Sequence, residues 1–142
     1  MNKPVTDIPP VAPGLFTLPP YDQAAPRLLG GFCPHCNRHY FPRPKYCRVC
    51  LGSVEESVLG SEGTLYSFTV VRRKPPLGLP EPYGVGYIDL ADNDLRIFCL
   101  LDPAAVEQLR IGLPMRLAVG PLGHDGKGSP RLRPYFTPLT ED

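Results

Sequence analysis

A chain of 142 residues with a formal net charge of +1 has room for one or two small domains and is close to electrically neutral. Near-neutrality argues against a general nucleic-acid binder, whose surface is clearly basic. No stretch approaches the roughly 18 consecutive apolar residues of a membrane span. Residues 1–20 lack the basic and apolar segments of a signal peptide. We therefore expect a cytoplasmic protein whose thiols are reduced, with no membrane contact.

The first segment, residues 1–30, predicts an arm. Residues 1–20 contain six prolines and show almost no hydrophobic periodicity, which indicates an extended chain that cannot pack a core of its own. Residues 21–32 have room for one short helical turn, interrupted at Pro26 and closed at Gly30 and Gly31. An unanchored arm that carries Phe16 would be useful when draped over another subunit.

Two CxxC pairs identify the second segment, residues 31–59. Cys33 and Cys36 form the first pair, Cys47 and Cys50 the second, and ten residues separate them. This spacing predicts a rubredoxin-like zinc ribbon in which the four thiolates hold one structural Zn²⁺. Each knuckle needs a left-handed residue after its second cysteine, a role that Asn37 and Gly52 suit. Two alternatives remain, a pair of disulfides and replacement of one cysteine ligand by His35.

Zinc binding changes the electrostatics. Four thiolates on one Zn²⁺ carry a net charge of about −2, which brings the whole chain from +1 to about −1. The ribbon itself is locally basic. Its cations are either a solvated face or a patch that offsets the cluster and meets an anionic ligand or an acidic partner. They are Arg38, Arg43, Lys45 and Arg48.

The third segment, residues 60–142, reads as strands. β-Branched and aromatic residues near alternation predict five of them, with a proline-rich loop over 74–82 and a hairpin loop over 124–128. Asp102 and Pro103 are typical of a helix start and predict a short helix that ends before Gly112. Five strands with a helix between the third and fourth is the order of an OB-fold barrel. The predicted strands are 64–73, 83–90, 95–101, 114–122 and 131–139.

The chain offers few groups for catalysis of its own. Cys99 lies in the middle of a predicted core strand, where a small buried hydrophobe is the better interpretation than a nucleophile. His39 falls on the ribbon surface and His124 in a glycine-rich loop. No serine or cysteine has a base and an orienting acid nearby in the sequence. We predict no catalytic residue in this chain.

A mainly β chain with a zinc ribbon followed by a five-stranded OB-fold barrel resembles a known family, the zinc-ribbon/OB-fold accessory proteins of acyl-CoA enzymes. The resemblance covers about residues 30–140. The order of its motifs is more specific for the family than any single motif beyond the ribbon. The motifs are Cys33-Pro34-x-Cys36, Pro42-Arg43-Pro44, Cys47-x-x-Cys50, Gly63-x-Leu65-Tyr66-Ser67-Phe68-Thr69-Val70, Pro82-Tyr83, Ile111-Gly112-x-Pro114-Met115 and Arg133-Pro134-Tyr135-Phe136.

The resemblance implies a non-catalytic subunit. Members of this family pair with a thiolase-like or hydratase-like chain that carries the catalytic groups. Some serve thiolases that cleave 3-oxoacyl-CoA esters, benzoylsuccinyl-CoA among them, and others serve acyltransferases or enzymes of sterol side-chain degradation. This chain looks most like a stand-alone small subunit of the thiolase kind, with an acyl-CoA as substrate of the complex. The alternatives are an accessory subunit of an acyl-CoA hydratase or aldolase and a module that binds single-stranded nucleic acid.

Coenzyme A carries phosphates that favour arginine and lysine at a pocket mouth. Arg72, Arg73 and Lys74 end the first predicted strand of the barrel and open the proline-rich loop, so they are our candidates for contact with those phosphates. Ordinary edge-strand charge is the alternative interpretation. In the same loop, Leu77 and Leu79 are apolar residues suited to contact with a partner.

Overall fold

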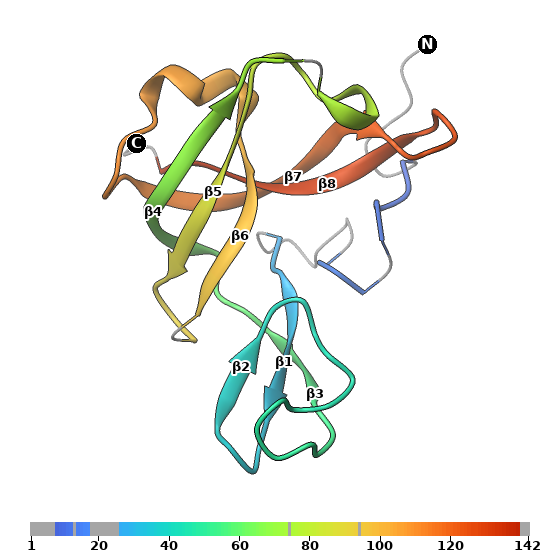
Figure 1. Ribbon diagram of the computed structural model, residues 1–142, viewed down its shortest axis with the longest axis vertical. Coiled ribbons are helices and arrows are strands. Elements are labelled where there is room, and N and C mark those ends of the chain that lie inside the picture. Colours follow the sequence, from blue (N-terminus) through green and yellow to red (C-terminus); the bar gives the residue numbers. More distant parts are fainter. Residues whose placement is uncertain (1–7, 13, 18–25, 74, 94, 140–142) are drawn as a thin grey trace.

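The computed structural model describes residues 8–12, 14–17, 26–73, 75–93 and 95–139. A small antiparallel sheet lies at one end of the molecule's longest axis and a closed barrel at the other (Figure 1). The small sheet has the strand order β2-β1-β3, with β1 at Leu29–Cys33, β2 at Arg38–Tyr40 and β3 at Glu55–Val58. The two cysteine knuckles extend from this sheet, which we call the ribbon.

Glycines let the ribbon strands approach one another closely. A Cβ at Gly30 would collide with the carbonyl oxygen of Tyr40, and one at Gly31 would collide with the side chain of Val54. Both glycines lie in β1, the central strand of the ribbon. The pair that was predicted to close a helical turn therefore serves sheet packing instead.

The barrel contains five strands in the order β4-β5-β6-β8-β7, and β7 pairs back with β4. All pairings are antiparallel except the one between β6 and β8. Together with the ribbon, this arrangement confirms the predicted mainly β fold, a ribbon followed by a five-stranded OB-fold barrel. The strands are β4 (Glu62–Val71), β5 (Tyr83–Leu90), β6 (Arg96–Leu101), β7 (Pro114–His124) and β8 (Pro130–Pro138).

Alternation along the strands fills the barrel. On β6, the side chains of Ile97 and Leu101 are buried in the core and the thiol of Cys99 packs against it, while Phe98 on the opposite face is exposed. The residues of this strand therefore alternate between the core and the outer face of the barrel, and Cys99 lies on the core side as predicted. Residues from every barrel strand complete the core, among them Leu65, Ile88, Met115, Leu117, Leu132 and Phe136.

The prediction of an unanchored arm is wrong for the part of the arm that the structure describes. Phe16 is only 3% exposed and belongs to the barrel's core cluster, and it bridges to Leu28. Nearer the start of the arm, Pro10 forms a parallel bridge with Leu132 of β8. The prolines prevent a helix, but they leave single bridges and apolar side chains free to pack. Of the predicted turn at 21–32, residues 21–25 lie outside the described part of the chain, and 26–32 hold no helix.

The predicted short helix is present as the 3₁₀ helix η3 (Pro103–Gln108), which is tighter than the α-helix that the capping pattern suggested. Asp102 caps it, because one carboxylate oxygen accepts from the backbone N–H of Ala104 at 2.9 Å. The other carboxylate oxygen accepts from the hydroxyl of Thr137 on β8 at 2.8 Å. One side chain thus ties the helix start to the last strand. The proline-rich loop contains a second short 3₁₀ turn, η2 (Pro76–Gly78).

Replacing Asp102 by alanine is expected to lower the free energy of unfolding by about 1–2 kcal/mol, because both the cap and the bond to Thr137 are lost. Urea denaturation of the zinc-loaded protein measures the change. Asp102→Asn keeps an oxygen for the cap and should lose less. An alanine variant as stable as the wild type would contradict the assigned role.

Candidate functional site

The four ribbon cysteines converge at one point. Their sulfur atoms all lie within 4.8 Å of one another, with 3.5 Å between Cys33 and Cys50 and 3.8 Å between Cys36 and Cys47. Zinc bound tetrahedrally at about 2.3 Å from each sulfur would separate the sulfurs by about 3.8 Å, whereas a disulfide would bring two of them to about 2.05 Å. The donor set and its spacing therefore fit a tetrahedral metal and not a disulfide.

The knuckles hold the sulfurs through their backbone. The N–H groups of Cys36, Val49 and Gly52 point at Cys33, Cys47 and Cys50 respectively, each at 3.4 Å. In the first knuckle Asn37 takes the left-handed conformation with φ 53°, as predicted. In the second knuckle the prediction of Gly52 is wrong, since Leu51 takes that conformation with φ 62°. The side chain of Leu51 is exposed, so nothing crowds it in this backbone conformation.

Tyr40 is a site residue that the sequence did not reveal. Its hydroxyl, from the end of β2, lies 3.2 Å from the sulfur of Cys47 in the buried side of the cluster. This hydrogen bond is the main reason that the pKa of Cys47 falls to about 5. It favours the thiolate, which is the form that binds a metal. No spacing rule connects a tyrosine seven residues away to this role.

The three histidines lie apart from the cysteine cluster. His35 is exposed in the first knuckle, and the metal-holding group found among the described residues consists of the four cysteines without it. The ring of His39 contacts that of Phe32 at a tilt, with 4.8 Å between ring centroids. The Nδ1 atom of His124 is 2.7 Å from the carbonyl oxygen of Asp125. His39 and His124 are therefore engaged in contacts within the chain, away from the cysteine cluster.

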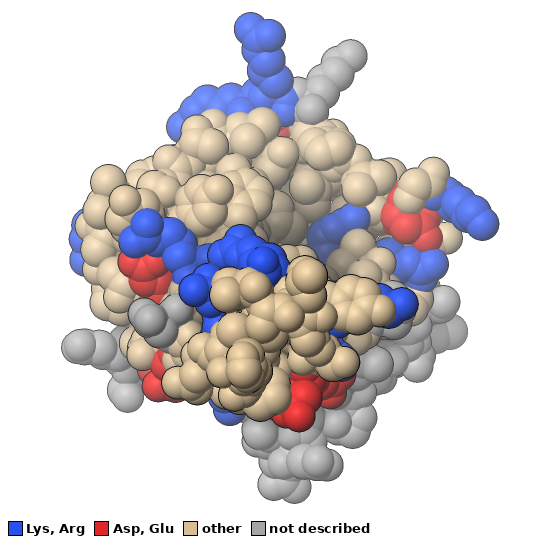
Figure 2. Space-filling model, turned by 60° about the horizontal axis from the view of Figure 1, so that its bottom comes forward, with Lys and Arg blue, Asp and Glu red and all other residues tan. Residues whose placement is uncertain are grey.

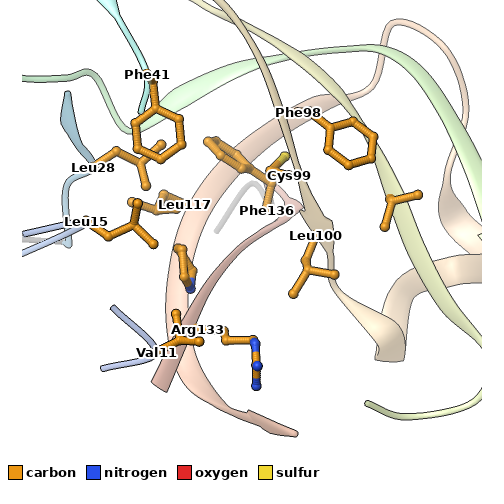
Figure 3. Close-up of a pocket in the computed structure, with 12 residues that line it drawn as sticks. Val11, Leu15, Leu28, Phe41, Phe98, Cys99, Leu100, Leu117, Arg133 and Phe136 are labelled. Carbon is orange, nitrogen blue, oxygen red and sulfur yellow. The ribbon is translucent and has the colours of Figure 1, made fainter. Parts of the chain in front are cut away.

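An apolar pocket of about 280 Å³ opens beside the short pairing between β6 and β8 (Figure 3). Strand β6 pairs with β8 only at Leu100 and Leu101, while the arm pairs with β8 at Leu132, and the pocket lies between them. Phe98 and Leu100 form one side, and Leu15, Leu28 and Phe41 form the other. The remaining lining residues are Val11, Val85, Cys99, Leu117, Arg133, Pro134 and Phe136.

Cys99 lines this pocket, and burial raises the pKa of its thiol to about 12. Because the thiolate is the reactive form, Cys99 in the zinc-loaded protein is expected to react with iodoacetamide at pH 8 at least about tenfold more slowly than in urea. Peptide mapping by mass spectrometry separates Cys99 from the ribbon cysteines. Equal labelling rates in the folded and unfolded protein would show that the thiol is not shielded.

A second, polar cleft of about 750 Å³ lies between the ribbon and the barrel. The ribbon side contributes Cys36, Asn37, Arg38, His39 and Arg48, and the barrel side contributes Asn93, Leu95 and Arg96. Figure 2 shows Lys and Arg side chains gathered where the projecting ribbon meets the barrel. We call this space the ribbon–barrel cleft. The sequence showed the ribbon cations, but not the barrel residues that face them.

The candidate phosphate-binding cations lie elsewhere. Arg72 and Arg73 are exposed just beyond the end of β4, at the end of the barrel far from the ribbon (Figure 1), and Lys74 lies outside the described residues. Neither arginine lines either of the two pockets described above. In the loop that follows, Leu77 is exposed and Leu79 is half-buried.

The arginines of β8 are engaged within the chain. Arg133 is buried and donates to the carbonyl oxygens of Leu122 and His124. Arg131 pairs with Asp125 at 2.8 Å. Burial lowers the pKa of Arg133, and both side chains hold the β7–β8 hairpin.

The described part of the chain contains no helix with the length and apolar character needed to span a membrane.

Comparisons with known proteins match both parts of the chain. A family model described as the rubredoxin-like zinc ribbon domain of ChsH2 matches residues 24–55, and one described as the C-terminal OB-fold domain of ChsH2 matches residues 56–120. The chain is 38% identical over 118 residues to the benzoylsuccinyl-CoA thiolase subunit BbsA of Thauera aromatica, which covers 82% of this chain and 80% of that protein. It is 31% identical over 118 residues to the BbsA subunit of Geobacter metallireducens, covering 82% and 78%.

A solved structure titled Ltp2-ChsH2(DUF35) aldolase has a similar fold. The TM-score is 0.63 at 24% sequence identity, over 80% of this chain and 86% of that one. At this level of identity the similarity concerns the fold alone.

Proposed function

Because the chain belongs to the family of zinc-ribbon/OB-fold subunits that includes BbsA and ChsH2, we propose that it is the non-catalytic small subunit of a CoA-dependent thiolase or acyltransferase complex. The observation that carries the proposal is the 38% identity to a benzoylsuccinyl-CoA thiolase subunit across both the ribbon and the barrel. A thiolase-like partner chain would supply the catalytic cysteine and histidines. The reaction of the complex would be thiolytic cleavage of a 3-oxoacyl-CoA, an aromatic one such as benzoylsuccinyl-CoA.

The proposed role of the metal is structural. Cys33, Cys36, Cys47 and Cys50 would hold one Zn²⁺, and all four tetrahedral positions would be filled by sulfur. Such a site leaves no open position for a substrate. It would fix the ribbon as a rigid projection beside the barrel, where it can assist assembly and acyl-CoA binding. Contact of Arg72, Arg73 and Lys74 with the CoA phosphates stays a prediction.

The barrel's outer face bears on the nucleic-acid alternative. Tyr87 and Phe98 are in tilted contact there with 5.2 Å between ring centroids, and both are exposed, as base stacking requires. However, the neighbouring Arg96 is paired with Asp89 at 2.6 Å. A carboxylate beside the aromatic pair disfavours a polyanion. This surface therefore supports a protein subunit better than a nucleic-acid binder.

Affinity purification of the tagged chain from its native host, followed by mass spectrometry and a CoA-thioester cleavage assay, tests the proposal. We expect a thiolase-like chain to copurify and cleavage to require both chains. Recovery of a hydratase or aldolase chain would replace the thiolase assignment with one of those alternatives. Recovery of nucleic acid, or of no partner, would overturn the accessory-subunit role.

A further inference from the structure

The ribbon–barrel cleft is rich in arginine. Three arginines line it, Arg38 and Arg48 from the ribbon and Arg96 from the barrel, and no aspartate or glutamate is among the lining residues that the structure describes. Arg96 is neutralised by Asp89, which it contacts with two nitrogens at 2.6 and 3.2 Å. Within the described residues, Arg38 and Arg48 form no ion pair. The cleft therefore presents two guanidinium groups that have no carboxylate partner among the described residues, and the zinc–thiolate centre, whose Cys36 lines the same cleft, offsets part of their charge.

Arg48 also lies over an aromatic ring. Its guanidinium lies over the ring of Tyr40, 5.7 Å from the centroid, and Tyr40 in turn contacts Cys47. A guanidinium within about 6 Å of a ring centroid is attracted to the ring face by the ring's quadrupole. Guanidinium groups bind phosphate oxygens through paired hydrogen bonds, so two arginines in one cleft suit a phosphate.

The two walls of the cleft are fixed relative to each other. Asn93, in the turn after β5, accepts a hydrogen bond at 2.7 Å from the backbone N–H of Gly60, which joins the ribbon to the barrel. A Cβ on Gly60 would come within 3.1 Å of the Asp92 carboxylate, so a larger residue there would require that side chain to shift. The adjacent Leu59 is fully buried, and its N–H donates to the carbonyl oxygen of Leu28 at 2.9 Å. A cleft with fixed walls binds a ligand at a smaller entropic cost than one that must close.

From the charge, the fixed walls and the volume of about 750 Å³, we propose that the ribbon–barrel cleft binds the phosphate groups of a nucleotide. In the complex of the proposed function, on which this inference rests, the ligand is the phosphorylated adenosine end of coenzyme A. Arg38 and Arg48 bind its phosphates. The site is on the ribbon side of the barrel, opposite the end that carries Arg72 and Arg73.

Titration calorimetry of the full, zinc-loaded chain without any partner tests the site, with coenzyme A, adenosine 3′,5′-bisphosphate and inorganic pyrophosphate as probes. We expect the two nucleotides to bind, and the double variant Arg38→Gln/Arg48→Gln to weaken their binding by about tenfold or more. Arg110→Gln/Arg116→Gln removes two exposed barrel arginines and is the matched control, expected to bind like the wild type. Arg72→Gln/Arg73→Gln tests the site expected from the sequence.

Several outcomes would overturn the proposal. One is a wild-type chain that binds none of the probes, and another is a cleft variant that binds them as the wild type does. Pyrophosphate binding as tight as that of the nucleotides would reduce the site to a simple anion site. Loss of zinc from the cleft variant would show that the arginines only offset the charge of the cluster. Loss of partner assembly without a change in probe binding would assign the cleft to an acidic segment of the partner.

The experiments distinguish failure of the proposed function from failure of the nucleotide site. If no thiolase-like chain copurifies but the isolated chain still binds adenosine 3′,5′-bisphosphate through Arg38 and Arg48, the nucleotide site stands and the complex does not. If the complex forms and the cleft variant leaves the KM for the acyl-CoA unchanged, the subunit role stands and the nucleotide site does not.

Discussion

Replacement of Cys47 by serine is expected to abolish stoichiometric zinc binding and to unfold the ribbon. Cys47 is fully buried, and among the described residues the ribbon's own core consists of Cys33, Cys47, Tyr40 and Val54, with Cys36 and Cys50 packed against it. So few apolar side chains cannot offset the chain entropy of ordering about thirty residues. In zinc-finger peptides, metal binding contributes on the order of 10 kcal/mol to folding, and a comparable share of the ribbon's stability would be lost here.

Elemental analysis and hydrogen exchange together measure this effect. The wild type should contain one zinc per chain, and the amides of β1, β2 and β3 should lose their protection in the variant while those of β5 and β7 keep most of theirs. Cys99→Ser is the matched control, because it removes a thiol outside the cluster and should retain the metal. A Cys47→Ser variant with full zinc content and a protected ribbon would contradict a four-cysteine site.

The ribbon could be predicted from the sequence because its determinants are local. Four metal ligands within eighteen residues define the fold of that segment almost regardless of the rest of the chain. The barrel strands were recognisable for a similar reason, since alternation is a property of each strand alone. The boundaries differ from those expected by a few residues, as at β4, which begins at Glu62 and ends before Arg72.

The features that were missed depend on contacts between distant positions. The ribbon–barrel cleft brings Arg38 to the same space as Arg96, and no pattern in either segment refers to the other. Phe16 was assigned to a free arm because prolines surround it, whereas it bridges to Leu28, just before the ribbon, and belongs to the same core cluster as the barrel residues. The composition of a segment indicates how that segment behaves in isolation. It does not reveal that a distant part of the chain forms a cavity into which one of its side chains packs, as happens for Phe16.

Replacement of Phe16 by alanine is expected to lower the free energy of unfolding by about 3–5 kcal/mol, as for other buried phenylalanines. The side chain is 3% exposed, and it packs in the cluster that joins the arm to the barrel. Its loss would also leave a cavity in this cluster, next to the point where Phe16 bridges to Leu28. Chemical denaturation at saturating zinc measures the change. Phe98→Ala is the matched control, since that ring is 58% exposed on the barrel's outer face and should cost about 1 kcal/mol or less.

The outcome also bears on where a partner docks. If Phe16→Ala unfolds at the same denaturant concentration as the wild type, the arm is not part of the core and its aromatic side chain is free for another subunit. If it loses several kcal/mol, the arm's large apolar side chain belongs to this chain's own fold. A partner must then use apolar groups that remain exposed, and on the barrel these include Tyr66, Tyr87 and Phe98. Tyrosine and phenylalanine beside an arginine are typical of interface centres, so a Phe98→Ala variant that folds normally but no longer binds the partner would locate the contact on that face.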